Sequence, residues 1–226
     1  VKREFGRKFI LKVMNNKRVW KGVAATLVAG TVIAGGWMVT RGELVTEVID
    51  GDSFKIANKT TVRLASLNAP EMGNCMATEA KEALTTKILR KRVVIQHPYN
   101  DLYRRTVALV YTNGELINEY MIRNGLAVTT RETGEENAAI QAANDYARER
   151  KLGVYSPRCY QPDPPNPKCP IKGNIDDRTH EKQYLLPDCR HYSKVIIERS
   201  FGEDYFCTEA QARAAGFTKS CDPRNE

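Results

Sequence analysis

Residues 43–71 read ELVTEVIDGDSFKIANKTTVRLASLNAPE, and this stretch decides the fold. Apolar and polar residues alternate along it, β-branched residues are frequent, and polar turn residues interrupt it at 50–52 and near 58–59. Such alternation is typical of half-buried strands, and short polar turns between the runs are typical of hairpins. The stretch therefore predicts three short strands in a meander.

The residues that follow extend the meander into a small barrel. Apolar residues at helical spacing predict a helix from Ala77 to Arg90, and β-branched runs predict strands at Val93–Ile95 and Val107–Tyr111. A second helix stops at residues 124–125, and a third covers about Glu135–Arg150. Five strands with a helix between the third and fourth is the order of an OB-type barrel. The expected fold class is therefore α+β, a five-stranded OB-type β-barrel with three helices.

The net charge of +8 is unevenly distributed along the 226 residues. Residues 1–22 hold eight cations and one acid, which account for seven of these eight positive charges. Binding of a polyanion therefore has to rest on individual arginines and not on a generally basic body. The composition, 42% hydrophobic and 27% charged, is that of a globular protein and excludes a collagen-like or low-complexity chain.

An uncharged run covers residues 22–40 and spans about 28 Å as a helix, close to the thickness of a bilayer core. Trp20 and Trp37 frame it, and the basic leader, residues 1–21, favours a cytoplasmic N-terminus. We expect a single transmembrane helix; a signal peptide cleaved near residues 32–34 is the alternative. Both place the remaining chain outside the cytoplasm, either membrane-anchored or secreted.

The composition changes again after the third helix. Residues 160–168 are rich in proline and predict a stiff, extended linker. Residues 169–226 form a second unit, with a strand predicted at Lys194–Ile197 and a helix around Glu209–Ala215. So small a unit depends on disulfides or a metal. The barrel domain therefore covers residues 43–159, and a small disulfide-rich α+β domain follows it.

The cysteines all follow the uncharged run, and their even number favours disulfides in an exported protein. They are Cys75, Cys159, Cys169, Cys189, Cys207 and Cys221. A zinc site is the alternative, built from His191 and three of the tail cysteines, but no C-x-x-C pair is present and the spacings match no common ligand pattern. The four tail cysteines can pair in three ways, and the sequence does not select one.

Three polar clusters in the predicted barrel are candidates for chemistry. Residues 50–52 (DGD) are either an ordinary hairpin turn or part of a metal site. Arg63 is a cation in mid-strand and needs an anionic partner, which is either a structural salt bridge or a substrate. Residues 101–105 (DLYRR) are by themselves a solvated turn. No single cluster decides the function.

Together, the motifs D-G-D, R-L-x(5)-P-E, D-x-Y-x-R and N-G-x-x-I-N-x-x-M-I-R-N-G-L-A resemble the staphylococcal nuclease (thermonuclease-like) family along nearly all of residues 43–159. The resemblance implies an enzyme that hydrolyses phosphodiester bonds of DNA and RNA with little sequence preference and leaves 3′-phosphate ends. It also implies Ca²⁺ as the cofactor. No protein partner can be inferred, and a monomer is expected.

The resemblance also implies roles for individual residues. Glu71 looks like the general base that activates water, and Arg63 and Arg105 look like the pair that clamps the scissile phosphate. Tyr103 matches a substrate-contacting tyrosine, and Asp101 is placed with it at the substrate. The chemistry agrees, because a bidentate guanidinium neutralises charge on a phosphoryl transition state better than lysine does.

The metal site shows one departure from the family pattern D-[TA]-P-E. Asp52 looks like a calcium carboxylate, and Ala69 offers its backbone carbonyl, but Asn68 stands where the family usually has a second carboxylate. An amide oxygen carries no charge, so weaker calcium binding is expected. An exported enzyme tolerates this at millimolar external calcium. The alternatives are a non-catalytic nucleic-acid-binding module, which Asn68 motivates, and an envelope interaction protein that acts through its tail.

Two further features follow from the resemblance. Cys75, soon after the P-E motif, and Cys159, after the last helix, are placed as in secreted bacterial members of the family, so we hypothesise that they pair. The tail is similar to the small sunset-type domain found behind bacterial nuclease domains. It is more distantly similar to the zinc module of methylphosphotriester repair proteins, but most of the ligands of that module are replaced here, which favours disulfides.

Overall fold

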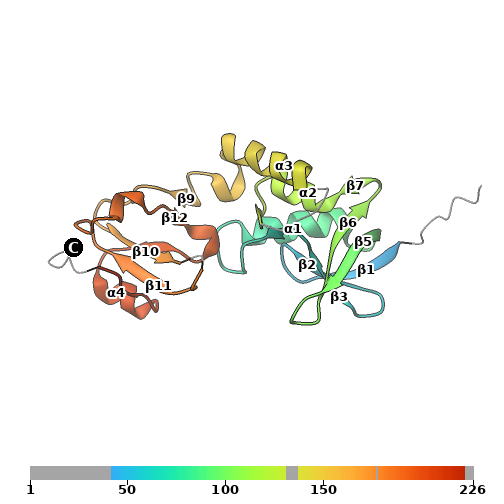
Figure 1. The fold of residues 1–226 in the computed structure, drawn as a ribbon, viewed down its shortest axis with the longest axis horizontal. Coiled ribbons are helices and arrows are strands. Elements are labelled where there is room, and N and C mark those ends of the chain that lie inside the picture. Colours follow the sequence, from blue (N-terminus) through green and yellow to red (C-terminus); the bar gives the residue numbers. More distant parts are fainter. Residues whose placement is uncertain (1–41, 131–136, 177, 222–226) are drawn as a thin grey trace, which may run out of the picture. The chain divides into compact units, whose positions relative to one another are not determined.

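A computed structural model describes residues 42–130, 137–176 and 178–221 (Figure 1). The leader, residues 1–21, and the uncharged run, residues 22–40, lie outside the described residues, so the expected membrane helix stays a prediction. Within the described ranges, no helix is long and apolar enough to span a bilayer.

A closed β-barrel forms the first part of the described chain. The strands β3, β2, β1, β5 and β6 are hydrogen-bonded in that order, and a parallel pairing of β3 with β6 closes the ring. Val62 lies opposite Thr106 and Leu64 opposite Ala108 in that closing pair. The bounds are β1 (Glu43–Val48), β2 (Ser53–Ile56), β3 (Thr61–Leu64), β5 (Arg92–Asn100) and β6 (Thr106–Thr112). The five-stranded barrel predicted from the sequence is thus confirmed.

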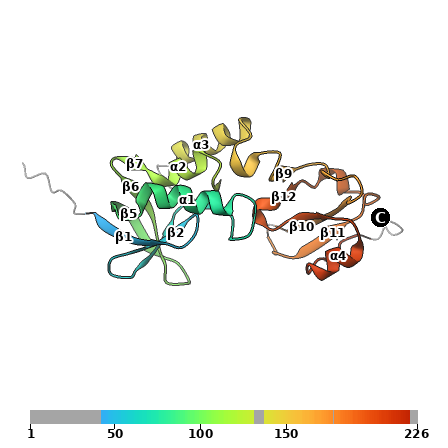
Figure 2. The same ribbon diagram turned by 180° about the vertical axis from the view of Figure 1, so that it is seen from behind.

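Three helices pack against the barrel and against one another (Figure 2). They are α1 (Ala77–Ile88), α2 (Ile117–Arg123) and α3 (Asn137–Glu149). Leu84 and Ile88 of α1 and Met121 of α2 are fully buried and join Phe54 of the barrel in one hydrophobic core. The predicted helices are confirmed where the structure describes them. Short strands β4 (Leu67–Asn68), β7 (Glu115–Leu116) and β8 (Val128–Thr129) were not expected.

One buried amide ties α2 to the barrel. The side chain of Asn118 is inaccessible to solvent, and its Nδ2 donates to the carbonyl oxygens of Ala65 and Ala108 at 2.8 and 3.2 Å. Its Oδ1 accepts the N–H of Val110 at 2.9 Å. Ala65 directly follows β3 and Ala108 lies in β6, the two strands whose pairing closes the barrel. This side chain therefore stabilises the closure of the barrel.

The C-terminal module, residues 160–221, contains a second sheet. Its strands are ordered β13-β10-β11-β14, and Tyr184 and Phe217 pack beneath them with α4. A separate antiparallel pair joins β9, at the start of the module, to β12. The bounds are β9 (Tyr160–Gln161), β10 (Ile171–Ile175), β11 (Lys182–Leu185), β12 (Ile197–Glu198), β13 (Asp204–Phe206), α4 (Glu209–Ala214) and β14 (Thr218–Lys219). The helix predicted around Glu209–Ala215 is confirmed.

The strand predicted at Lys194–Ile197 is wrong. The 3-10 helix η2 (Tyr192–Lys194) covers its start, and only Ile197 belongs to a strand. The buried Nζ of Lys172 donates to the carbonyls of Tyr192 and Val195 at 3.0 and 2.6 Å. These carbonyls are therefore held by a side chain and take no part in a strand ladder.

Three disulfides connect all six cysteines. Cys75 pairs with Cys159, as hypothesised, and the tail pairs Cys169 with Cys207 and Cys189 with Cys221. The alternative zinc site is excluded, because its three cysteine ligands are all in disulfides. Among the described residues, no group of His, Cys, Asp and Glu side chains could hold a metal ion by itself.

We predict that Asn118→Ala lowers the free energy of unfolding by about 3 kcal/mol, because three buried backbone groups lose a hydrogen-bond partner. Urea unfolding followed by circular dichroism measures the change. Asn124→Ala is the matched control, since the exposed Asn124 makes a single bond to the carbonyl of Tyr120 and its loss should change little. Equal effects of the two substitutions would contradict the proposed closure.

Candidate active site

The turn between β1 and β2 buries a carboxylate. Asp52 is 3% exposed, and its Oδ1 accepts a hydrogen bond from Ser53 Oγ at 2.7 Å while its Oδ2 accepts one from the N–H of Ala69 at 3.1 Å. Asp50 shapes the turn, because its Oδ1 accepts the N–H groups of Asp52 and Ser53. At Gly51 a Cβ would lie under 3 Å from side chains of Ala69 and α1, so only glycine fits.

Arg63 connects the carboxylate to the neighbouring strand. Its Nη1 forms an ion pair with Asp52 Oδ1, and its Nη2 donates to Asn68 Oδ1 at 2.9 Å. The position follows from the register, because Ser53 of β2 lies opposite Arg63 of β3. One guanidinium thus donates to two acceptor oxygens from different segments of the chain. The anionic partner that the sequence required for Arg63 is Asp52.

The loop between β5 and β6 fixes a second arginine. Asp101 Oδ1 accepts the N–H groups of Tyr103 and Arg105, both at 2.9 Å, and its Oδ2 accepts a bond from Arg105 Nε at 2.7 Å. The parallel pairing of β3 with β6 places this loop at the N-terminal end of β3, the strand that carries Arg63, since Val62 lies opposite Thr106. Asp101 therefore positions Arg105, whereas Tyr103 is 81% exposed with its ring 5.3 Å from the Arg105 guanidinium.

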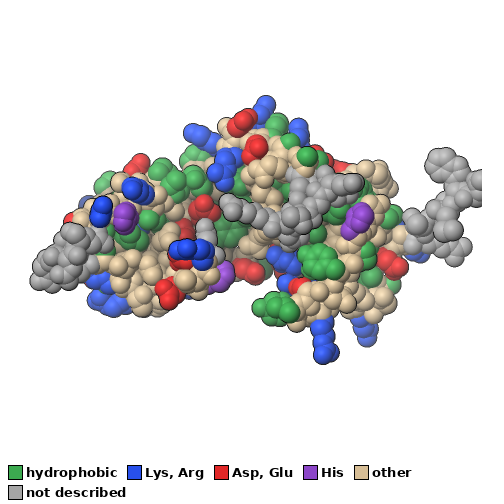
Figure 3. Space-filling view, viewed as in Figure 1, with side chains coloured by type: hydrophobic (Ala, Val, Ile, Leu, Met, Phe, Trp, Pro, Cys, Tyr) green, Lys and Arg blue, Asp and Glu red, His purple; other side chains and the backbone are tan. Residues whose placement is uncertain are grey.

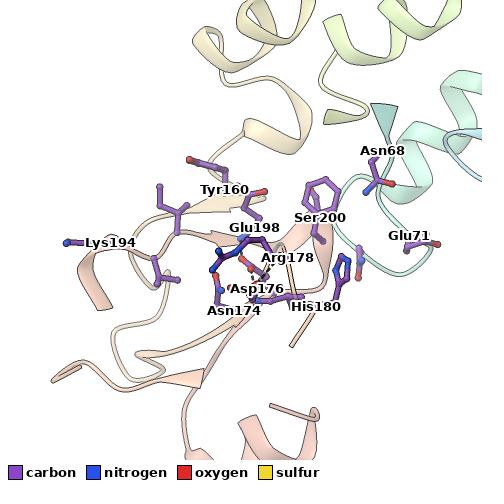
Figure 4. Close-up of a pocket in the computed structure, with 16 residues that line it drawn as sticks. Asn68, Glu71, Tyr160, Asn174, Asp176, Arg178, His180, Lys194, Glu198 and Ser200 are labelled. Atoms are coloured by element: carbon purple, nitrogen blue, oxygen red, sulfur yellow. Dashed lines mark hydrogen bonds between the residues drawn. The ribbon is translucent and has the colours of Figure 1, made fainter. Parts of the chain in front are cut away.

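Glu71 lies in the loop between β4 and α1, three residues after Asn68. Its side chain is exposed, and in the part of the chain that the structure describes no ion pair engages its carboxylate. Glu71 and Asn68 together line the edge of a cavity of about 740 Å³ (Figure 4). The carboxylate is therefore accessible to water and to a ligand.

The C-terminal module holds the loop that carries Glu71. The N–H of Cys75 donates to the carbonyl of Arg199 at 3.3 Å, and the N–H of Arg199 donates to the carbonyl of Cys159 at 2.8 Å. The backbone of Arg199 thus contacts both halves of the Cys75–Cys159 disulfide. Sequence reasoning missed this contact, as it missed the hydroxyl of Ser53 on Asp52, because neither pair shows any local pattern.

Burial sets the protonation of Asp52. Loss of solvent raises the pKa of its carboxyl above the usual value of 3.8, and the nearby charge of Asp50 raises it further. The guanidinium of Arg63 and the hydrogen bonds from Ser53 and Ala69 act in the opposite direction. The carboxylate therefore depends on Arg63 for its charged form.

The oxygen ligands available for a metal are few. Asp52 contributes a carboxylate, Asn68 an amide oxygen and Ala69 a backbone carbonyl, and the first two already share a single cation, the guanidinium of Arg63. Oxygen ligands of this kind suit Ca²⁺ or Mg²⁺ and do not suit zinc. The residues fit calcium, with one carboxylate and a correspondingly low charge.

Charges on the described surface agree with the sequence analysis. Figure 3 shows lysine, arginine, aspartate and glutamate side chains interspersed across the face in view. The face in view is therefore not uniformly basic.

Comparison with known proteins decides the family. Residues 61–157 match the family model described as staphylococcal nuclease homologue. The chain is 31% identical over 156 residues to a micrococcal nuclease of Shigella flexneri, and the aligned region covers 63% of this chain and 88% of that protein. The chain belongs to the staphylococcal nuclease family. The chain is also similar to the protein ParB of Escherichia coli, at 29% identity over 62% of this chain and 86% of that protein.

A more distant relative is a probable endonuclease LCL3 of Verticillium alfalfae, 30% identical over 56% of this chain and 47% of that protein. The family match ends at residue 157 and so does not reach the C-terminal module. The likeness of the tail to a sunset-type domain therefore stays a prediction.

We predict that titration of Asp52 contributes measurably to the pH dependence of the free energy of unfolding. Because the folded state raises its pKa, Asp52 stabilises the fold below pH 3.8, and this contribution is lost as the pH rises through the folded-state pKa. Asp52→Asn does not titrate. The free energy of unfolding of this variant, relative to wild type, should therefore increase as the pH rises above 3.8.

Urea unfolding at a series of pH values measures this difference. A relative stability of Asp52→Asn that falls with rising pH contradicts the assignment.

Proposed function

We propose that the protein is a nuclease that hydrolyses phosphodiester bonds of DNA, RNA or both. The observation that carries this proposal is the shared guanidinium of Arg63, which joins the buried Asp52 to Asn68 beside the exposed Glu71. The names of its relatives, micrococcal nuclease and endonuclease, support the same activity.

The arginines bind the scissile phosphate in this proposal. Arg63 lies in β3 and Arg105 directly precedes the neighbouring strand β6, and each is oriented by an aspartate, Asp52 or Asp101. Two oriented guanidiniums stabilise the negative charge that grows on the phosphoryl oxygens in the transition state. Tyr103 is exposed beside Arg105 and offers its ring to a neighbouring base.

Glu71 acts as the general base. Its exposed carboxylate takes a proton from the water that attacks phosphorus, and the disulfide Cys75–Cys159 holds its loop against the barrel domain. A base held in position removes the proton as the new P–O bond forms and the P–O bond to the leaving 5′ oxygen breaks, and solvent water protonates that oxygen. Such proton removal is the usual source of rate enhancement by general-base catalysis.

Calcium is the proposed cofactor, held by Asp52, Asn68 and the carbonyl of Ala69. When bound, such an ion supplies positive charge next to the phosphate. The chain supplies only one carboxylate there, so we propose a weak site that works at the millimolar calcium of an extracytoplasmic compartment. The three disulfides support export, since disulfides persist in oxidising compartments. A membrane anchor at residues 22–40 completes the proposal.

A second candidate is a module that binds nucleic acid without cutting it. The observation that favours it is Asn68, whose amide oxygen is bound to Arg63 and brings no charge to the metal site. The two candidates differ in one outcome, because a binding module retains intact DNA in the presence of calcium.

We predict that Glu71→Gln lowers kcat for DNA cleavage by roughly 10²- to 10⁴-fold with little change in KM, because the substitution removes a base and no substrate contact. Cleavage of a fluorescent oligonucleotide by the purified protein measures both constants. Glu82→Gln, on the exposed face of α1, is the matched control and should keep full activity. Unchanged cleavage by Glu71→Gln removes Glu71 from the mechanism.

We predict that Asn68→Asp restores a second carboxylate and lowers the calcium concentration for half-maximal cleavage by roughly ten-fold, since ligand charge tunes calcium affinity. A titration from micromolar to tens of millimolar Ca²⁺, with an EDTA control, measures it in both proteins. Wild-type activity that appears only in the millimolar range fits a weak site. Absence of cleavage at every calcium concentration, with DNA still bound, favours the second candidate.

A further inference from the structure

The cavity beside Glu71 is built mainly by the C-terminal module. Asn68, Glu71 and Asn74 form one side, and the remaining described lining comes from the C-terminal module, at Tyr160, around the end of β10 and on either side of β12 (Figure 4). Its volume of about 740 Å³ lies in the range of pockets that bind small molecules. The space is therefore large enough for a nucleoside, and it opens at the candidate general base.

The charges of the lining do not fit a phosphate. Among the described residues that line the cavity, four carry carboxylates and two carry cationic groups; they are Glu71, Asp176, Glu198 and Glu203 against Arg178 and Lys194. Like charges repel strongly where solvent is partly excluded, so a phosphodiester backbone is disfavoured inside. A neutral ligand that carries hydrogen-bond donors fits this lining.

Asp176 is oriented before any ligand arrives. Its Oδ1 accepts the N–H groups of Arg178 and Thr179 at 2.9 and 2.8 Å and a bond from the hydroxyl of Thr179. These backbone bonds lower the pKa of the Asp176 carboxyl and keep it ionised. Because the described contacts all use Oδ1, the second oxygen stays available as an acceptor. In Figure 4, Asp176 lies in one group with Arg178 and Glu198 among the residues that line the cavity.

Ser200 gives a second, independent indication of a ligand. The residue is 1% exposed and lines the cavity, yet its Oγ has no hydrogen-bond partner within the described structure. A buried hydroxyl without a partner is costly. The Oγ itself has almost no accessible surface, so a polar ligand in the cavity removes this cost when the Ser200 side chain turns towards it. The rings of Tyr160 and Phe201 also line the space and offer stacking surfaces.

We propose that this cavity is a nucleobase subsite, which takes a base next to the scissile phosphate and prefers bases with an exocyclic amino group over thymine or uracil. Carboxylates accept hydrogen bonds from such amino groups, as they do from N4 of cytosine in the major groove. The subsite rests on the proposed nuclease function and adds to it a base preference that the C-terminal module determines.

Binding of single-stranded oligodeoxycytidine and oligothymidine of equal length tests the proposal. The full-length protein is used with EDTA so that no strand is cut, and fluorescence anisotropy gives each Kd. We expect the cytidine strand to bind more tightly by a few-fold to about ten-fold, the range that one or two hydrogen bonds provide. Equal Kd values in wild type overturn the proposal.

Two variants assign the preference to the cavity. Asp176→Asn keeps an Oδ1 acceptor for the turn and removes the charge, and Ser200→Ala removes a hydroxyl that has no partner in the described structure. Each should bring the ratio of the two Kd values towards one. Asp188→Asn, an exposed acid of the same module outside the lining, is the control and should leave the ratio unchanged. A ratio that survives in both cavity variants overturns the proposal.

Two comparisons separate the remaining explanations. A short arginine-rich peptide is the first comparison. If its binding is weakened by Asp176→Asn while the binding of both oligonucleotides is unchanged by that substitution, the cavity is a peptide site and the proposal is overturned. Cleavage with calcium but no base preference removes the subsite alone. A base preference without cleavage removes the nuclease function and leaves the subsite standing.

Discussion

The ion pair between Arg63 and the buried Asp52 is the interaction on which the candidate active site depends. A carboxylate in this environment is costly unless a cation and hydrogen-bond donors surround it. Arg63, Ser53 and the N–H of Ala69 provide those contacts, and they also fix the turn between β1 and β2 to the segment that carries Asn68. The stability of the barrel and the geometry of the site therefore have the same origin.

The second constraint is the attachment of the loop that carries Glu71. This loop has no regular structure of its own, yet the Cys75–Cys159 disulfide and the backbone of Arg199 both hold it at Cys75. A general base acts efficiently only when its position is fixed relative to the reacting atoms. The disulfide lies within the barrel domain, whereas Arg199 belongs to the C-terminal module, and this contact links that module to the chemistry proposed for the barrel.

Sequence reasoning was accurate where the signal is local. Alternation in residues 43–64 and helical spacing in Ala77–Arg90 predicted elements that the structure contains, because each element buries one face of a periodic segment. It failed at Lys194–Ile197, where Lys172 holds the carbonyls from another strand. The tail sheet was not foreseen because its strands are short and depend on disulfides between distant residues.

The sequence by itself determined the barrel, its helices and the candidate residues, since periodicity and ordered motifs are properties of neighbouring positions in the chain. Only the tertiary structure decided what those residues contact. The sharing of Arg63 between Asp52 and Asn68, the orientation of Arg105 by Asp101 and the pairing of the tail cysteines all follow from folding. The acidic cavity beside Glu71 is the clearest case, because its walls are brought together from segments more than a hundred residues apart, such as Asn68 and Asp176.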